Sequence, residues 1–180
     1  MSSLSRRVCT HAVAVMALSL PAAAEAQQSD ADLKAVSATT LTMPRYKQYL
    51  DATVNLANAA AKNPGLAEGT KDDGGGKSIA EQVKALESIP EAKAAITSTG
   101  LSTRDYVLTQ WALLQTGMAY SMTQQAGASQ EDMIKQAGVS KANMEFYAKN
   151  EAEIKKLAEE AKARTPAMAD DEDAEDDTGE

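Results

Sequence analysis

Cysteine and histidine are almost absent from this chain of 180 residues, because each occurs only once, as Cys9 and His11. All later positions therefore lack both a thiol and an imidazole. The part of the chain after His11 can therefore form no disulfide, no zinc site with thiolate or imidazole ligands, no histidine-ligated haem and no histidine-based catalytic triad. Packing alone must then hold the fold together.

Long apolar runs are also scarce. The run from Val8 to Leu20 is shorter than the ~20 residues that a membrane-spanning helix needs, and no later segment approaches its length. Two arginines precede this run, and a small-residue sequence, Ala-Glu-Ala, follows it and ends at Ala26. This order is typical of a secretory signal peptide. We therefore expect residues 1–26 to be cleaved near Ala26 and the mature protein to be periplasmic or secreted, with no transmembrane segment.

Clustered basic residues are missing as well. The formal net charge is −8, and eight acidic residues lie between Asp170 and Glu180, so the remainder of the chain is neutral on balance. A nucleic-acid-binding protein needs a basic patch, so we expect no nucleic-acid partner. The acidic tail, residues 166–180, lacks the glycine turn and ligand spacing of a calcium loop. Because it has little apolar surface to bury, we predict that it is disordered.

Alternation of apolar and polar residues, the pattern typical of strands, is not sustained anywhere in the chain, which indicates an all-α fold. We expect a small irregular helical bundle of about four to six helices over residues 41–165. Residues 27–40 form a polar arm that is either mobile or a short packed helix. Hydroxyl side chains that cap helix starts are predicted at Thr42, Ser78, Ser102, Ser129 and Ser140.

The helix that follows Ser102 is predicted to be the centre of the bundle. It holds the single tryptophan, Trp111, and the densest apolar sequence after the leader. Residues at spacings of four, three and four share one side of a helix, and these are Val107, Trp111, Leu114 and Met118, with Leu108, Ala112 and Ala119 widening the face. Gly117 lowers helix stability by ~1 kcal/mol relative to alanine, and we expect it to let another helix approach closely.

A glycine-rich segment before Ser78 resembles the end of a phosphate-binding P-loop. That motif requires a further glycine at position 71, which is Lys71 here. We therefore interpret the segment as a loop that ends in a capping serine.

Met118 and Met122 lie one helical turn apart and offer thioethers, which bind Cu(I). Methionine at helical spacing is more often found in a packed core. We therefore predict no metal site.

Catalysis without thiols and imidazoles would depend on carboxylates such as Asp105 and Glu81. Both are explained as first-turn residues that stabilise a helix start. We therefore expect a non-enzymatic exported protein that binds another protein or an envelope component and needs no cofactor. Its oligomeric state does not follow from the sequence.

The alternative function is a carrier for a small apolar ligand, held in a cavity between helices near Trp111. The candidate ligand-binding residues are Tyr106, Trp111, Met118 and Tyr120. Aromatic residues are few, and a small core uses most of them, which favours packing over a ligand pocket. An enzyme with carboxylate chemistry is the third hypothesis.

Overall fold

The computed structural model describes residues 29–63, 66, 77–126 and 129–165, and these contain helices and no strand, which confirms the all-α fold class. The predicted signal peptide, most of the loop before Lys77 and the acidic tail lie outside the described residues. No described helix is both long enough and apolar enough to cross a membrane. The helices are α1 (Asp30–Ala38), α2 (Met43–Lys62), α4 (Ile79–Glu87), α5 (Pro90–Thr97), α6 (Thr103–Ala126), α7 (Gln130–Ala137) and α8 (Lys141–Arg164).

Serine and threonine caps begin the helices at the predicted positions. The hydroxyl groups of Thr42, Ser78, Ser129 and Ser140 each accept the backbone N–H three residues later. Ser102 does the same for Asp105 at 3.0 Å. The Glu81 carboxylate also accepts the Ser78 N–H at 2.8 Å, which completes a capping box. Because each cap joins neighbours in the chain, the helix boundaries follow from local sequence.

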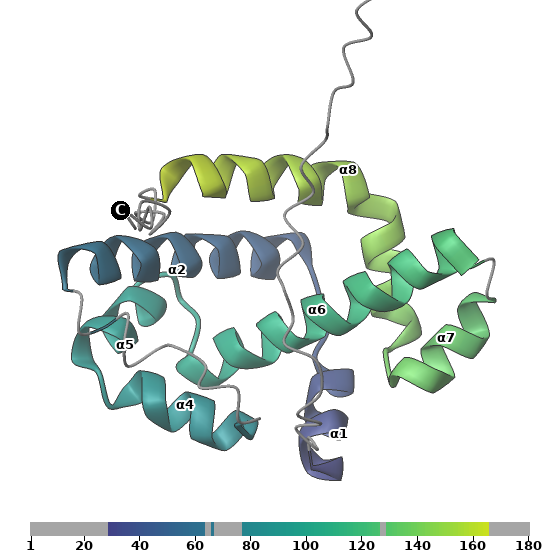
Figure 1. Cartoon of the computed structure of the whole chain (residues 1–180), viewed down its shortest axis with the longest axis horizontal. Coiled ribbons are helices and arrows are strands. Elements are labelled where there is room, and N and C mark those ends of the chain that lie inside the picture. The colour runs from purple at the N-terminus through teal and green to yellow at the C-terminus, as the bar shows by residue number, and fades with distance from the viewer. Residues whose placement is uncertain (1–28, 64–65, 67–76, 127–128, 166–180) are drawn as a thin grey trace, which may run out of the picture.

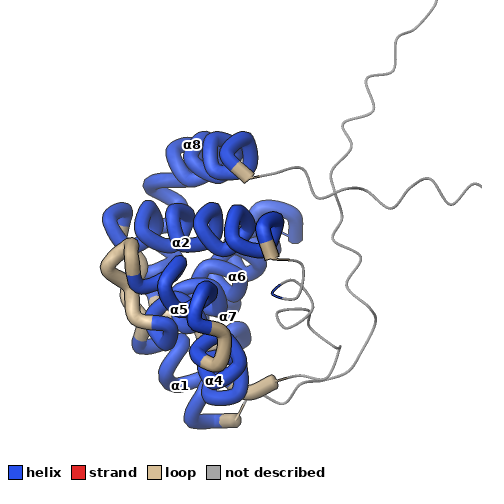
Figure 2. Tube along the Cα trace, turned by 90° about the vertical axis from the view of Figure 1, so that its left-hand side faces the viewer, coloured by secondary structure: helices blue, strands red, loops and turns tan. Residues whose placement is uncertain are grey.

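α6 is the axis of the bundle and contacts each of the other six described helices. It crosses the centre of Figure 1, and Figure 2 shows α2 and α8 on one side of it and α1 and α4 on the other. α1 lies within residues 27–40, for which the sequence allowed either a mobile arm or a short packed helix. The structure has the short helix, and it buries Val36. The other six described helices lie within residues 41–165, the region for which four to six were expected.

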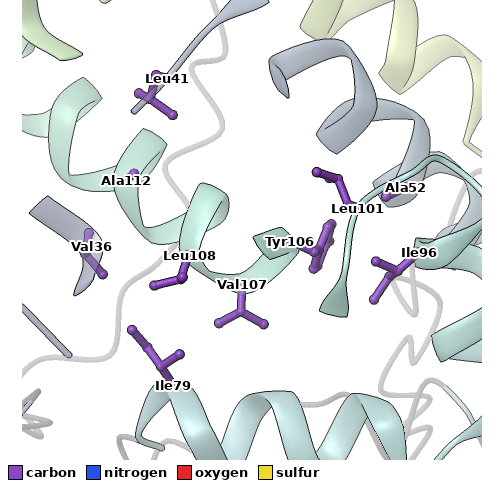
Figure 3. Close-up of a cluster of buried hydrophobic side chains, with 10 residues drawn as sticks. All are labelled: Val36, Leu41, Ala52, Ile79, Ile96, Leu101, Tyr106, Val107, Leu108 and Ala112. Atoms are coloured by element: carbon purple, nitrogen blue, oxygen red, sulfur yellow. The ribbon is translucent and has the colours of Figure 1, made fainter. Parts of the chain in front are cut away.

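Two groups of buried side chains surround α6. The larger group consists of Val36, Leu41, Ala52, Ile79, Ile96, Leu101, Tyr106, Val107, Leu108 and Ala112 (Figure 3). In it, Ile79 of α4 lies near Val107 and Leu108 of α6. The smaller group, Ala119, Met133, Val139 and Met144, joins the C-terminal half of α6 to α7 and the start of α8. The core therefore follows α6 along most of its length.

The prediction that this side of α6 is buried along its whole length is wrong. Leu114 and Met118 are half exposed, whereas the polar residues Thr109 and Thr116 are fully buried. Apolar residues occur around the whole circumference of α6, so helical period alone does not select the side that neighbours cover. Thr109 is covered because it faces α2, whose Arg45 Nε donates to its hydroxyl at 2.8 Å.

Gly117 lies where α6 approaches α8 closely, as the sequence predicts. A Cβ atom built on Gly117 would lie 3.4 Å from Tyr147 Oη and 3.6 Å from two ring carbons. These are ordinary contact distances, so one methyl group fits and a larger side chain does not.

We expect Gly117→Ala to raise the free energy of unfolding by up to about 1 kcal/mol, because alanine favours the helix and its methyl group fits. Gly117→Val places further methyl groups against the Tyr147 ring, and overpacking of this kind costs about 1–3 kcal/mol. Urea unfolding followed by Trp111 fluorescence measures both variants. Effects of the same sign would contradict the close approach of α6 and α8.

Candidate functional site

The exposed α6 face consists of Leu114, Met118 and Met122. These side chains are 50%, 52% and 54% exposed, and the only other exposed large apolar side chain in the described residues is Leu33 on α1. They follow each other at four-residue spacing, which places them on one side of the helix. The result is an apolar surface about two helical turns long.

α4 covers the N-terminal half of the same side of α6 and does not extend over the exposed α6 face. Val83 and Leu86 of α4, like Trp111, pack against the main core. Trp111 Nε1 donates to Gln82 Oε1 at 3.2 Å. α4 has nine residues whereas α6 has 24, so it is too short to reach the whole length of α6. The exposed α6 face therefore continues an apolar contact that is already made within the chain.

α7 and α8 pack against a different side of the C-terminal half of α6. Ala119 is buried with residues of both helices. Tyr120 lies against Tyr147, with ring centroids 5.2 Å apart, and its hydroxyl donates to Glu151 Oε2 at 3.0 Å. That hydrogen bond is the largest cause that raises the pKa of Tyr120. These contacts cover another side of α6 and leave Leu114, Met118 and Met122 exposed.

The four predicted ligand-binding residues lie in different surroundings. Tyr106 is buried in the core and stacks on Tyr49, with ring centroids 5.2 Å apart, and burial raises the pKa of both phenols. Trp111 is half-buried beside α4, Met118 is exposed, and Tyr120 lies against α8. Only Met118 belongs to the exposed α6 face.

A polar network between α2 and α6 was not predicted from the sequence. Arg45 Nη2 donates to Asp105 Oδ1 at 2.6 Å, and Arg45 Nε donates to Thr109. Hydrogen bonding from the Ser102 hydroxyl is the largest cause that lowers the pKa of Asp105, and Arg45 lowers it further. The capping role of Asp105 is readable from the sequence, but its partner lies 60 residues away.

Two open clefts of about 430 Å³ each lie elsewhere. The cleft between α2 and α5 is lined by residues that include Asn55, Asn58, Lys62 and Glu91. The cleft at the starts of α2 and α6 includes Thr42 and the paired Arg45 and Asp105. Neither cleft is lined by Trp111.

The described residues contain no group of three or more histidine, cysteine, aspartate or glutamate side chains placed to hold a metal ion. Comparison with known proteins found no matching family model, no matching curated protein and no matching solved structure.

Proposed function

We propose that the chain is an exported, non-enzymatic helical protein that binds an apolar surface of another protein or an envelope component through the exposed α6 face. The observation that carries this proposal is the half exposure of Leu114, Met118 and Met122 in a helix with no charged residue from Tyr106 to Ala126. Binding surfaces are enriched in methionine and depleted of charge at their centre. Methionine also adapts to partners of different shape.

The fold supports this proposal because the bundle is arranged around α6 but leaves one side of it open. Solvent-facing sides of helices are usually polar and charged, as α8 is, with Lys155–Glu151 and Lys156–Glu160 pairs. The exposed α6 face departs from this rule in the same molecule. The leader sequence before Ala26 supports export to a compartment where envelope components are accessible.

No feature of the described residues favours the hypothesis of a small-ligand carrier over plain packing. The indole of Trp111 already has a partner in Gln82, and Tyr106 is packed against Tyr49. We therefore place the function on the exposed α6 face and not beside Trp111.

A photo-crosslinking amino acid at position 118 of the full-length chain, in its native host, tests the proposal. We expect it to form an adduct with a second macromolecule, which mass spectrometry identifies. The matched control is position 94 on α5, which is also exposed, and it should form none. Leu114→Glu should remove the adduct at position 118 without changing the melting temperature. Equal adducts at both positions, or none at position 118, would refute the proposed function.

A further inference from the structure

Methionine is the only residue type with sulfur in the chain after Cys9. A two-electron oxidant converts the methionine thioether to a sulfoxide, and the susceptibility of a sulfur side chain to oxidation follows its exposure. Because this part of the chain has no thiol, no thiolate competes with the methionines for such an oxidant. The position of each methionine in the fold therefore decides which of them react.

Burial divides the described methionines clearly. Met118 and Met122 are 52% and 54% exposed, whereas Met133 is 9% exposed and Met144 is fully buried. Met43 is partly buried. The two exposed methionines lie one helical turn apart on the exposed α6 face, and the two buried ones belong to the smaller core group. An oxidant dissolved in water thus reaches the first pair in the folded bundle, but it reaches the second pair only when helices separate.

We propose that Met118 and Met122 form a reversible oxidation site for peroxides. In each reaction a lone pair of the thioether sulfur attacks one peroxide oxygen, so that an S–O bond forms and the O–O bond breaks. The departing oxygen leaves as water after taking up the second proton of the peroxide. The sulfur is oxidised by two electrons and the peroxide is reduced by two. Methionine sulfoxide reductases reverse the change, and a dithiol that becomes a disulfide supplies the electrons.

Oxidation at this site changes the surface of the molecule and leaves its core intact. A sulfoxide is polar, and burying a polar group in an apolar contact without a hydrogen-bond partner is unfavourable. Of the three side chains of the exposed α6 face, only Leu114 then remains apolar. The effect on binding rests on the proposed function, because it acts on the same face: the reduced chain binds its partner and the oxidised chain releases it.

Limited treatment of the full-length chain with hydrogen peroxide tests the site directly. Tandem mass spectrometry measures sulfoxide formation at each methionine, with Met133 and Met144 as internal controls. We expect Met118 and Met122 to react about tenfold faster than the two controls, while the melting temperature stays unchanged. Equal rates at the four positions, or unfolding on oxidation of Met118 and Met122 alone, would overturn the inference.

Hydrophobic-interaction chromatography of the isolated chain measures the surface change. We expect oxidation to shorten the retention of the wild type, and treatment with methionine sulfoxide reductases of both stereospecificities to restore it. The matched control is the double variant Met118→Leu/Met122→Leu, which keeps two apolar side chains but has no sulfur at these positions. Its retention should not respond to peroxide. An equal response of the variant and the wild type would mean that other methionines cause the change, and would refute the site.

The effect on binding is measured with a photo-crosslinking amino acid at position 114 of the purified full-length chain. Reduced, oxidised and reductase-treated samples are each irradiated with an envelope fraction of the native host. We expect the adduct to disappear on oxidation and to return after reduction, and equal adducts in all samples would refute the regulation. If even the reduced chain forms no adduct, the proposed function fails, whereas sulfoxide rates and retention still decide whether the oxidation site exists.

Discussion

Asn143→Ala is expected to lower the free energy of unfolding by about 3 kcal/mol, because it leaves two buried backbone groups without partners. Asn143 is only 1% exposed. Its Oδ1 accepts the Leu41 N–H at 2.9 Å, and its Nδ2 donates to the Thr39 carbonyl at 2.8 Å. The side-chain amide thereby satisfies a donor and an acceptor of the linker between α1 and α2.

Urea unfolding followed by Trp111 fluorescence measures this effect. Asn150→Ala is the matched control, because Asn150 Nδ2 donates to Phe146 O within its own helix at 2.7 Å, and its loss should cost less than about 1 kcal/mol. Asn143→Asp keeps the acceptor for Leu41 but loses the donor and buries a carboxylate, so it should be at least as damaging as alanine. Equal effects at positions 143 and 150 would show that the linker is held by other contacts.

The contrast between Asn143 and the helix caps shows which part of the fold is readable from the sequence. Ser140 caps α8 through Asn143 N–H, three residues away, and such pairs are visible as local patterns. The two backbone partners of the Asn143 side chain lie 102 and 104 residues away. No local pattern specifies that distance. The helix boundaries were therefore predictable, whereas the polar contacts between helices were not.

The same limit applies to the candidate site. Periodicity correctly places Leu114 and Met118 on one side of α6, but it does not say whether another helix covers that side. Covering depends on the position of α4, which starts at Ile79 beside Val107 and Leu108 and runs back towards the start of α6, and on the sides that α7 and α8 take (Figures 1 and 3). In this chain the N-terminal half of the stripe is covered and the C-terminal half is exposed, so a core prediction becomes a candidate binding face.

Leu108→Ala and Leu114→Ala should therefore differ strongly, although they make the same chemical change in the same helix. Leu108 is 9% exposed and lies among core residues that include Val36 and Ile79 (Figure 3). Truncation of a buried leucine typically costs about 2–5 kcal/mol through lost burial and the cavity that remains. Leu114 is half exposed, so its truncation should cost less than about 1 kcal/mol.

Urea midpoints for both variants, with unchanged dependence on denaturant, give the comparison directly. Because both changes replace leucine by alanine in one helix, the difference in helix propensity cancels between them. Equal losses would mean that Leu114 is part of the core and that the exposed α6 face does not exist in solution. If Leu114→Ala is nearly neutral for stability but weakens crosslinking at position 118, the apolar character of this face contributes to binding rather than to folding.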